Sequence, residues 1–226
     1  MILRTIRRKA ESFLPLSLWL KSQRKLSTTE LAQLTPEAIL NDQVRAACIK
    51  RLKLISLTKK SGNDASQAAV LVPLCGKKDN NDATLEDTAL RETWEELHIP
   101  RDTVDVWGSG NLVERKHVSV LPVLGFIGEV DPKSLPVNTH EVEEAFVQPL
   151  EKLCDPQFCR YTQFRDNYTL PTYIGGDHKI WGLTAVITHL VMSALVPGVY
   201  KHKIAYLKPI RGESEKSSTS SKAQKS

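Results

Sequence analysis

The sequence contains little cysteine and no long hydrophobic run. Four cysteines among 226 residues are too few for a disulfide-stabilised scaffold. No apolar stretch reaches the roughly 18 residues that a membrane-spanning helix needs, so no membrane span is expected. Hydrophobic residues make up 41% of the chain and charged residues 25%, which excludes collagen-like, coiled-coil and wholly disordered classes. An ordinary globular protein remains.

Several familiar catalytic motifs are also absent. The sequence holds neither a Walker phosphate-binding loop nor a dinucleotide-binding glycine motif. Cys154 and Cys159 lack a second ligand pair at zinc spacing, and all four cysteines are expected to be reduced. Residues 108–110, Gly-Ser-Gly, do not match the G-x-S-x-G nucleophile elbow and predict a turn. The histidines show no metal-type pairing and no visible triad.

Acidic residues are scarce at the two ends of the chain. Residues 1–29 carry seven basic side chains against Glu11 alone, for a net charge of +6. Residues 207–226 carry five basic and two acidic side chains, for +3, which leaves −4 for residues 30–206 out of the total of +5. A nucleic-acid-binding protein would place its positive charge on the folded part, so no nucleic-acid partner is expected.

These charges predict three parts of the chain. Residues 1–29 are rich in Arg, Lys, Ser and Leu, which is typical of a mitochondrial transit peptide. The alternative is a basic N-terminal helix with no targeting role. Residues 207–226 end in a stretch without large apolar side chains, and they predict a disordered basic tail. Residues 30–206 are the expected folded domain.

The hydrophobic pattern of the middle part mixes helices and strands without regular alternation, which favours an α+β fold. Helices are expected at residues 35–54, 84–97, 143–153 and 183–195. Strands are expected at residues 68–75 and 117–130, and a hairpin joins 168–174 to 178–181 through Gly-Gly-Asp. Residues 59–67 and 76–82 are expected to be loops.

The helix expected at residues 84–97 carries a cluster of carboxylates. Glu92 and Glu96 are four residues apart and stack on one face, with Glu95 at its flank and Arg91 able to pair with Glu95. Clustered carboxylate oxygens suit magnesium or manganese better than zinc. From the glutamates alone, a solvated acidic face is the more common explanation. Trp94 is expected to pack against the protein and not to stack on a substrate.

The order Arg-Glu-x-x-Glu-Glu resembles the second half of the Nudix box, G-x5-E-x7-R-E-U-x-E-E-x-G-U, where U is apolar. The similarity extends over about residues 68–206, and it is closest to the coenzyme A diphosphatase branch of the Nudix hydrolases. The segments that carry it are Leu-Val-Pro-Leu at 71–74, the strand residues at 120–123, Glu-Val-Glu-Glu at 141–144 and Trp-Gly-Leu-Thr-Ala at 181–185. The resemblance implies a Nudix fold, which is a mixed sheet sandwiched between helices.

The resemblance also implies an activity and a role for each residue. The activity is the metal-dependent hydrolysis of the pyrophosphate bond of coenzyme A and its thioesters, to an adenosine bisphosphate and a phosphopantetheine. Glu92 and Glu96 would bind Mg²⁺ or Mn²⁺, Glu95 would serve the metal or act as a base, and Arg91 would orient these groups. Glu141 or Glu143, in the downstream acidic cluster, would supply a further ligand or base. The partner is a small nucleotide-type substrate, and the protein is expected to be a mitochondrial monomer or homodimer.

The sequence departs from the family pattern before the helix and directly after it. Ala83 and Lys77 occupy the box positions of a glutamate and a glycine, and His98 replaces the glycine that ends the helix in a left-handed conformation. Between Cys75 and Gly76, family members have a further strand and loop, so the fold is expected to lack one strand and loop. Two alternatives follow: a catalytically impaired Nudix-like binding or regulatory protein, or a Nudix hydrolase of another nucleoside diphosphate derivative.

Overall fold

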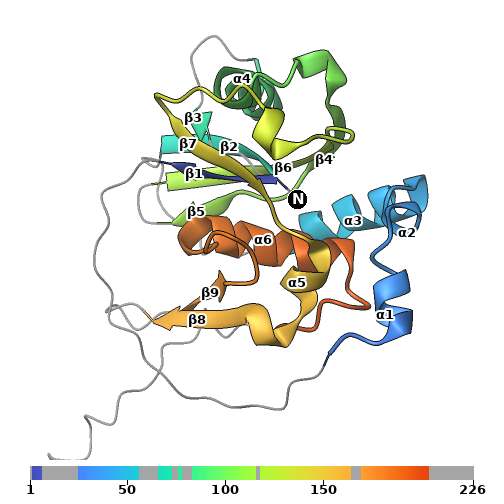
Figure 1. Cartoon of the computed structure of the whole chain (residues 1–226). Coiled ribbons are helices and arrows are strands. Elements are labelled where there is room, and N and C mark those ends of the chain that lie inside the picture. The colour runs from blue at the N-terminus through green and yellow to red at the C-terminus, as the bar shows by residue number, and fades with distance from the viewer. Residues whose placement is uncertain are drawn as a thin grey trace, which may run out of the picture.

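A computed structural model describes residues 2–6, 25–55, 66–72, 76–77, 83–115, 118–163 and 169–203 (Figure 1). The helices are α1 (Thr28–Ala32), α2 (Pro36–Ile39), α3 (Asp42–Leu54), α4 (Leu85–Leu97), α5 (Leu150–Cys154) and α6 (Gly182–Leu195). The strands are β1 (Ile2–Ile6), β2 (Ser66–Val72), β3 (Gly76–Lys77), β4 (Asp105–Ser109), β5 (Val113–Arg115), β6 (Val118–Phe126), β7 (Val142–Val147), β8 (Cys159–Gln163) and β9 (Thr169–Tyr173). No helix in these ranges is long and apolar enough to cross a membrane.

Strand β6 is the centre of a mixed sheet. β2 pairs with it in parallel, from Ser66 opposite Val118 to Val72 opposite Leu124. β4 and β5 pair with β6 antiparallel, and β3 extends the sheet antiparallel beyond β2. Because successive side chains of a strand point to opposite faces, β6 contributes to two separate cores.

Helices cover both faces of this sheet, with α4 above it and α6 below it in the view of Figure 1. On one face, Leu97 of α4 belongs to the same buried cluster as Val123 of β6. On the other face, Leu52 of α3 and Val191 of α6 pack in a cluster with Leu124. The expected α+β fold, a mixed sheet between helices, is confirmed.

The first strand comes from the segment that was expected to be a targeting sequence. β1 pairs antiparallel with β7, with Ile2 opposite Val147 and Thr5 opposite Glu144. The register shifts between Thr5 and Ile6, which forms a bulge in this ladder. The alternative of a basic N-terminal helix is therefore wrong for residues 2–6. Among the described residues, β1 is the strand that pairs with β7.

Two predicted helices differ in the structure. The helix predicted at residues 35–54 divides into α2 and α3, because the Asn41 side chain accepts a hydrogen bond from the Val44 N–H (3.0 Å) and so begins α3. The helix predicted at residues 143–153 is strand β7 followed by the short helix α5. The β-branched and aromatic residues of β7 favour a strand, and Pro149 begins α5 separately because it has no N–H to continue a helix.

Two predicted irregular segments contain strand instead. Gly76 and Lys77 form β3, whereas residues 78–82 of that predicted loop lie outside the described residues. The turn predicted at residues 108–110 is wrong, because Gly108 lies in β4 at a register shift opposite β6. Gly108 has a φ of +141°, and a Cβ there would approach Ile49 Cγ2 at 3.3 Å, so this glycine allows a bulge against α3.

The other predicted elements are confirmed within the described residues. The strand predicted at 68–75 is β2 up to Val72, and the helix predicted at 183–195 is α6. The strand predicted at 117–130 is β6, which ends at Phe126, so residues 127–130 are not part of it. An antiparallel bridge between Tyr173 and Ile180 closes the Gly-Gly-Asp hairpin. Of the loop predicted at 59–67, Ser66 and Gln67 instead begin β2, and residues 59–65 lie outside the described residues. Cys75, after which the missing strand and loop are predicted, also lies outside them.

Candidate active site

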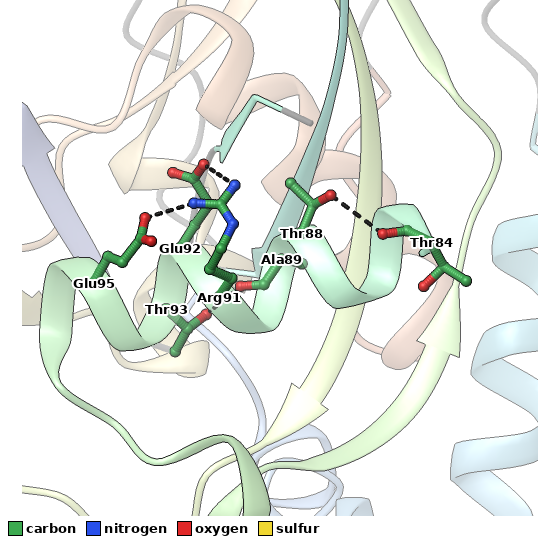
Figure 2. A network of polar contacts seen from close by, with 7 residues as sticks. All are labelled: Thr84, Thr88, Ala89, Arg91, Glu92, Thr93 and Glu95. Atoms are coloured by element: carbon green, nitrogen blue, oxygen red, sulfur yellow. Dashed lines mark hydrogen bonds and ion pairs between the residues drawn. The ribbon is translucent and has the colours of Figure 1, made fainter. Parts of the chain in front are cut away.

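Helix α4 begins at a capping box. Thr84 Oγ1 accepts the Asp87 N–H (3.0 Å), and the Asp87 carboxylate accepts the Thr84 N–H (3.1 Å). Farther along the helix, the Thr88 hydroxyl donates to the Thr84 carbonyl and the Thr93 hydroxyl donates to the Ala89 carbonyl (Figure 2). These local bonds stabilise the first turns of α4. The carboxylates discussed below lie in the second half of the same helix.

The end of α4 confirms the conformation expected at the missing glycine. His98 has a φ of 51° and a ψ of 32°, which is the left-handed region, and its N–H donates to the Trp94 carbonyl (2.9 Å). The Trp94 ring meets the His98 ring edge-on, at 5.4 Å between centroids. Trp94 packs against His98 but is 48% exposed, so it is not buried as most tryptophans are. It lies on the outer face of α4 with the exposed Glu95 and His98.

The three glutamates in the second half of α4, Glu92, Glu95 and Glu96, lie at different depths. Glu96 is buried with only 4% of its surface exposed, whereas the exposed fractions of the Glu92 and Glu95 side chains are 15% and 46%. Burying a carboxylate is unfavourable unless a cation or hydrogen bonds compensate for the lost water. The carboxylates therefore extend from the protein interior to solvent along one helix.

Arg91 bridges two of these carboxylates. Its guanidinium donates to Glu92 Oε1 at 2.9 Å and to Glu95 Oε2 at 2.5 Å. Figure 2 shows Arg91 between Glu92 and Glu95 on the same side of α4. Such charge-assisted hydrogen bonds restrict the rotamers of both acids. The expected pairing of Arg91 with Glu95 is confirmed, and the second bond to Glu92 was not anticipated.

Glu141 lies in the turn that precedes β7, and this turn is joined to the end of α4. The Asn138 N–H donates to the Glu96 carbonyl (2.8 Å), and the Asn138 carbonyl accepts the Glu141 N–H (3.0 Å). Glu141 and Glu143 are both exposed. The structure thus brings the backbone of the downstream acidic cluster to the last turn of α4, although the two segments are far apart in sequence.

The chemistry of the α4 side chains fits a divalent cation. Arg91, Glu92, Glu95 and Glu96 together carry a formal charge of −2, and carboxylate oxygens are the ligands that Mg²⁺ and Mn²⁺ prefer. Among the described residues, no three His, Cys, Asp or Glu side chains lie close enough together to hold a metal ion. The structure therefore supplies the donor type and the charge, with Arg91 holding two of the acids.

Sequence reasoning missed the contact between His178 and Glu144. His178 Nε2 lies 2.9 Å from Glu144 Oε2, and the His178 ring lies 4.7 Å from the Phe146 ring between centroids. This contact joins the Gly-Gly-Asp hairpin to β7. No spacing in the sequence signals it, because the two residues come from elements that meet only in the folded chain.

The described cysteines carry no reactive chemistry. Cys48, Cys154 and Cys159 are buried and free. Burial raises the pKa of the Cys48 thiol to about 11 and the pKa of the other two thiols to about 12, so all three are neutral near pH 7. The expectation of reduced cysteines is confirmed for these three, and Cys75 lies outside the described residues.

Comparison with known proteins adds an independent finding. A family model described as the NUDIX domain matches residues 42–168. The chain is 38% identical over 178 residues to a Homo sapiens protein named mitochondrial coenzyme A diphosphatase NUDT8, covering 63% of this chain and 75% of that protein. The Mus musculus protein of the same name is 35% identical over 196 residues, covering 72% and 93%. Nudix hydrolase 3 of Caenorhabditis elegans is 30% identical over 169 residues, covering 66% and 70%.

Proposed function

Because the chain belongs to the Nudix hydrolase family, we propose that it hydrolyses the pyrophosphate bond of coenzyme A and its thioesters. The products are an adenosine bisphosphate and a phosphopantetheine, which keeps its acyl group when the substrate is a thioester. The observation that carries this proposal is the Arg91–Glu96 constellation on α4, in a chain 38% identical to a protein named coenzyme A diphosphatase.

The carboxylates of α4 supply the donor type and the negative charge that Mg²⁺ or Mn²⁺ prefers. Glu92 and Glu96 would hold the cation, with Glu95 as a further carboxylate. A cation bound there would neutralise charge on the pyrophosphate and make a water molecule more acidic. Arg91 holds Glu92 and Glu95 in fixed rotamers, and its positive charge reduces the repulsion between the two acids.

Glu95 and Glu141 are the two carboxylates that would accept a proton from the attacking water. Glu95 is more exposed than Glu92 and Glu96, so solvent and substrate reach it more easily than the buried Glu96. Glu141 is exposed in the turn that is hydrogen-bonded to the end of α4. A general base must lie within hydrogen-bonding reach of the water, directly or through one further water.

The cellular location is part of the same proposal. Residues 1–29 would direct the chain to mitochondria, residues 30–206 would be the catalytic domain and residues 207–226 a disordered tail. The basic composition of residues 1–29 and the mitochondrial names of two relatives support this division. Pairing of β1 with β7 implies that the targeting segment contacts the domain before any cleavage.

The test is product analysis by mass spectrometry, after incubation of the full chain with coenzyme A and Mn²⁺ or Mg²⁺. Phosphopantetheine and adenosine bisphosphate are expected. Glu92→Gln and Glu96→Gln should each lower kcat/KM by more than the roughly 10–100-fold typical of residues that only support a ligand. Glu86→Gln, in the first turn of the same helix, is the matched control and should retain activity.

The other outcomes separate the alternatives. Cleavage of ADP-ribose or another nucleoside diphosphate derivative, without cleavage of coenzyme A, would assign the site to a different substrate. Binding of coenzyme A without products, unchanged in Glu96→Gln, would favour a binding or regulatory protein. In either case the proposed coenzyme A diphosphatase activity would be wrong.

A further inference from the structure

A cavity of about 470 Å³ lies beside the end of β6, on the side of the sheet that α6 covers. It is lined by α2, β4, β6 and the loop after it, β7, α5 and α6. Pockets that bind small molecules span roughly 300–1,000 Å³, so the cavity is large enough for one.

This cavity is separate from the candidate active site. No residue of α4 lines it. Leu124 of β6 lines the cavity and packs in the core of α6, whereas its neighbour Val123 packs in the core of α4. A molecule in the cavity would therefore lie across the sheet from the carboxylates.

Most of the side chains that line the cavity are apolar. Ile39 and Met192 line it and are buried. Leu40, Phe126 and Val147 line it as well, and each of them is more than a third exposed. Flexible aliphatic side chains dominate this lining, so few groups would orient a ligand by directional hydrogen bonds. Such a surface favours a hydrocarbon chain, whose affinity grows with the apolar area that it buries.

The charge at the rim restricts the polar end of such a ligand. Glu129 is exposed and is the charged side chain among the described residues that line the cavity, and no basic residue lines it. An anionic head group would be repelled there. We propose that this cavity binds the single hydrocarbon chain of an amphiphile whose group at the mouth is uncharged, such as an alcohol, ester or amide.

Calorimetric titration of the full chain with the series 1-hexanol to 1-nonanol tests this proposal. Each added methylene should tighten binding about fourfold while the chain still fits the cavity. Leu40→Glu should abolish binding, because it places a carboxylate at the mouth. Leu31→Glu is the matched control: both leucines are 42% exposed, but Leu31 of α1 does not line the cavity. Circular dichroism is used to check that both variants fold.

The charge requirement gives a second, independent measurement. Octanoate should bind more weakly than 1-octanol, and Glu129→Gln should reduce that difference. If Leu40→Glu folds poorly, Phe126→Ser replaces it as the test variant, and it should weaken the binding of 1-octanol. The proposal is overturned if no alcohol binds, if affinity does not depend on chain length, or if the Leu40 and Leu31 variants bind equally well.

Discussion

Arg91 donates to the carboxylate of its sequence neighbour Glu92, with Nη2 and Oε1 2.9 Å apart, while its other nitrogen Nη1 reaches Glu95. Neighbours on a helix do not normally face each other. The long arginine side chain turns back across the helix surface, and this allows it to hold two acids at once. Arg91 is therefore a positioning residue in the proposed site.

Arg91→Lys should lower kcat/KM by about 10–100-fold, because an ammonium group cannot form both bonds in the fixed geometry of a guanidinium. The half-saturating concentration of Mn²⁺ should rise in parallel, which a purely structural role would not require. Arg101→Lys is the control, since Arg101 pairs with Asp87 at the other end of α4 and should change neither quantity. Equal effects of the two substitutions would contradict the positioning role.

His98→Gly should stabilise the protein by about 1 kcal/mol. The histidine occupies the left-handed region at a cost of roughly 1–2 kcal/mol, and part of the gain is offset by the greater freedom of glycine when unfolded. Urea unfolding followed by circular dichroism measures the change. His140→Gly, at an exposed position without a positive φ, should instead be neutral or destabilising. Destabilisation by His98→Gly would show that the contact with Trp94 outweighs the backbone strain.

Local signals made α4 and its site largely predictable. Thr84 caps the helix through bonds within its first turn, and Arg91, Glu92 and Glu95 interact within two turns, so nearby residues suffice to determine them. Strand β7 was predicted wrongly as a helix, because its helix-forming Glu143, Glu144 and Ala145 stand against only a few β-branched and aromatic residues. Its conformation is stabilised by pairing with β1 at the opposite end of the chain, which no local pattern reveals.

Stability should decrease as the pH falls from about 6.5 toward 4. Burial lowers the pKa of His189 to about 4, and burial also lowers the pKa of His202. His189 Nδ1 lies 2.8 Å from the Tyr200 hydroxyl, which in turn contacts the Tyr173 hydroxyl at 2.5 Å. Between these pH values the unfolded chain binds protons that the folded chain does not bind, so protonation favours unfolding.

Urea unfolding at pH 7.0 and pH 5.0 measures this dependence. His189→Gln removes one of the titrating groups and should make the pH dependence shallower, although it lowers stability at pH 7. His140→Gln is the control, since that side chain is exposed. An identical pH slope in the wild-type and His189→Gln proteins would contradict a titrating role for His189.

Removal of residues 1–24 should destabilise the domain and promote its association. Without β1, the edge of β7 that pairs with residues 2–6 would expose unpaired N–H and C=O groups, and such an edge pairs readily with another chain. The expected results are a lower Tm and a molar mass that rises with concentration in analytical ultracentrifugation. Deletion of residues 207–226, a segment of similar length, should change neither value.

A point substitution isolates the strand from the rest of the N-terminal segment. Because β1 and β7 form an antiparallel ladder, some N–H groups of β1 donate to β7 and others point away. Leu3→Pro and Arg4→Pro each remove one N–H. Because the two residues are neighbours in the ladder, one of these N–H groups is of the bonded kind and the other is not, so one substitution should lower the Tm markedly more than the other. If both substitutions and the deletion leave the Tm unchanged, β1 contributes nothing to the folded domain, and the segment is then free to act solely in targeting.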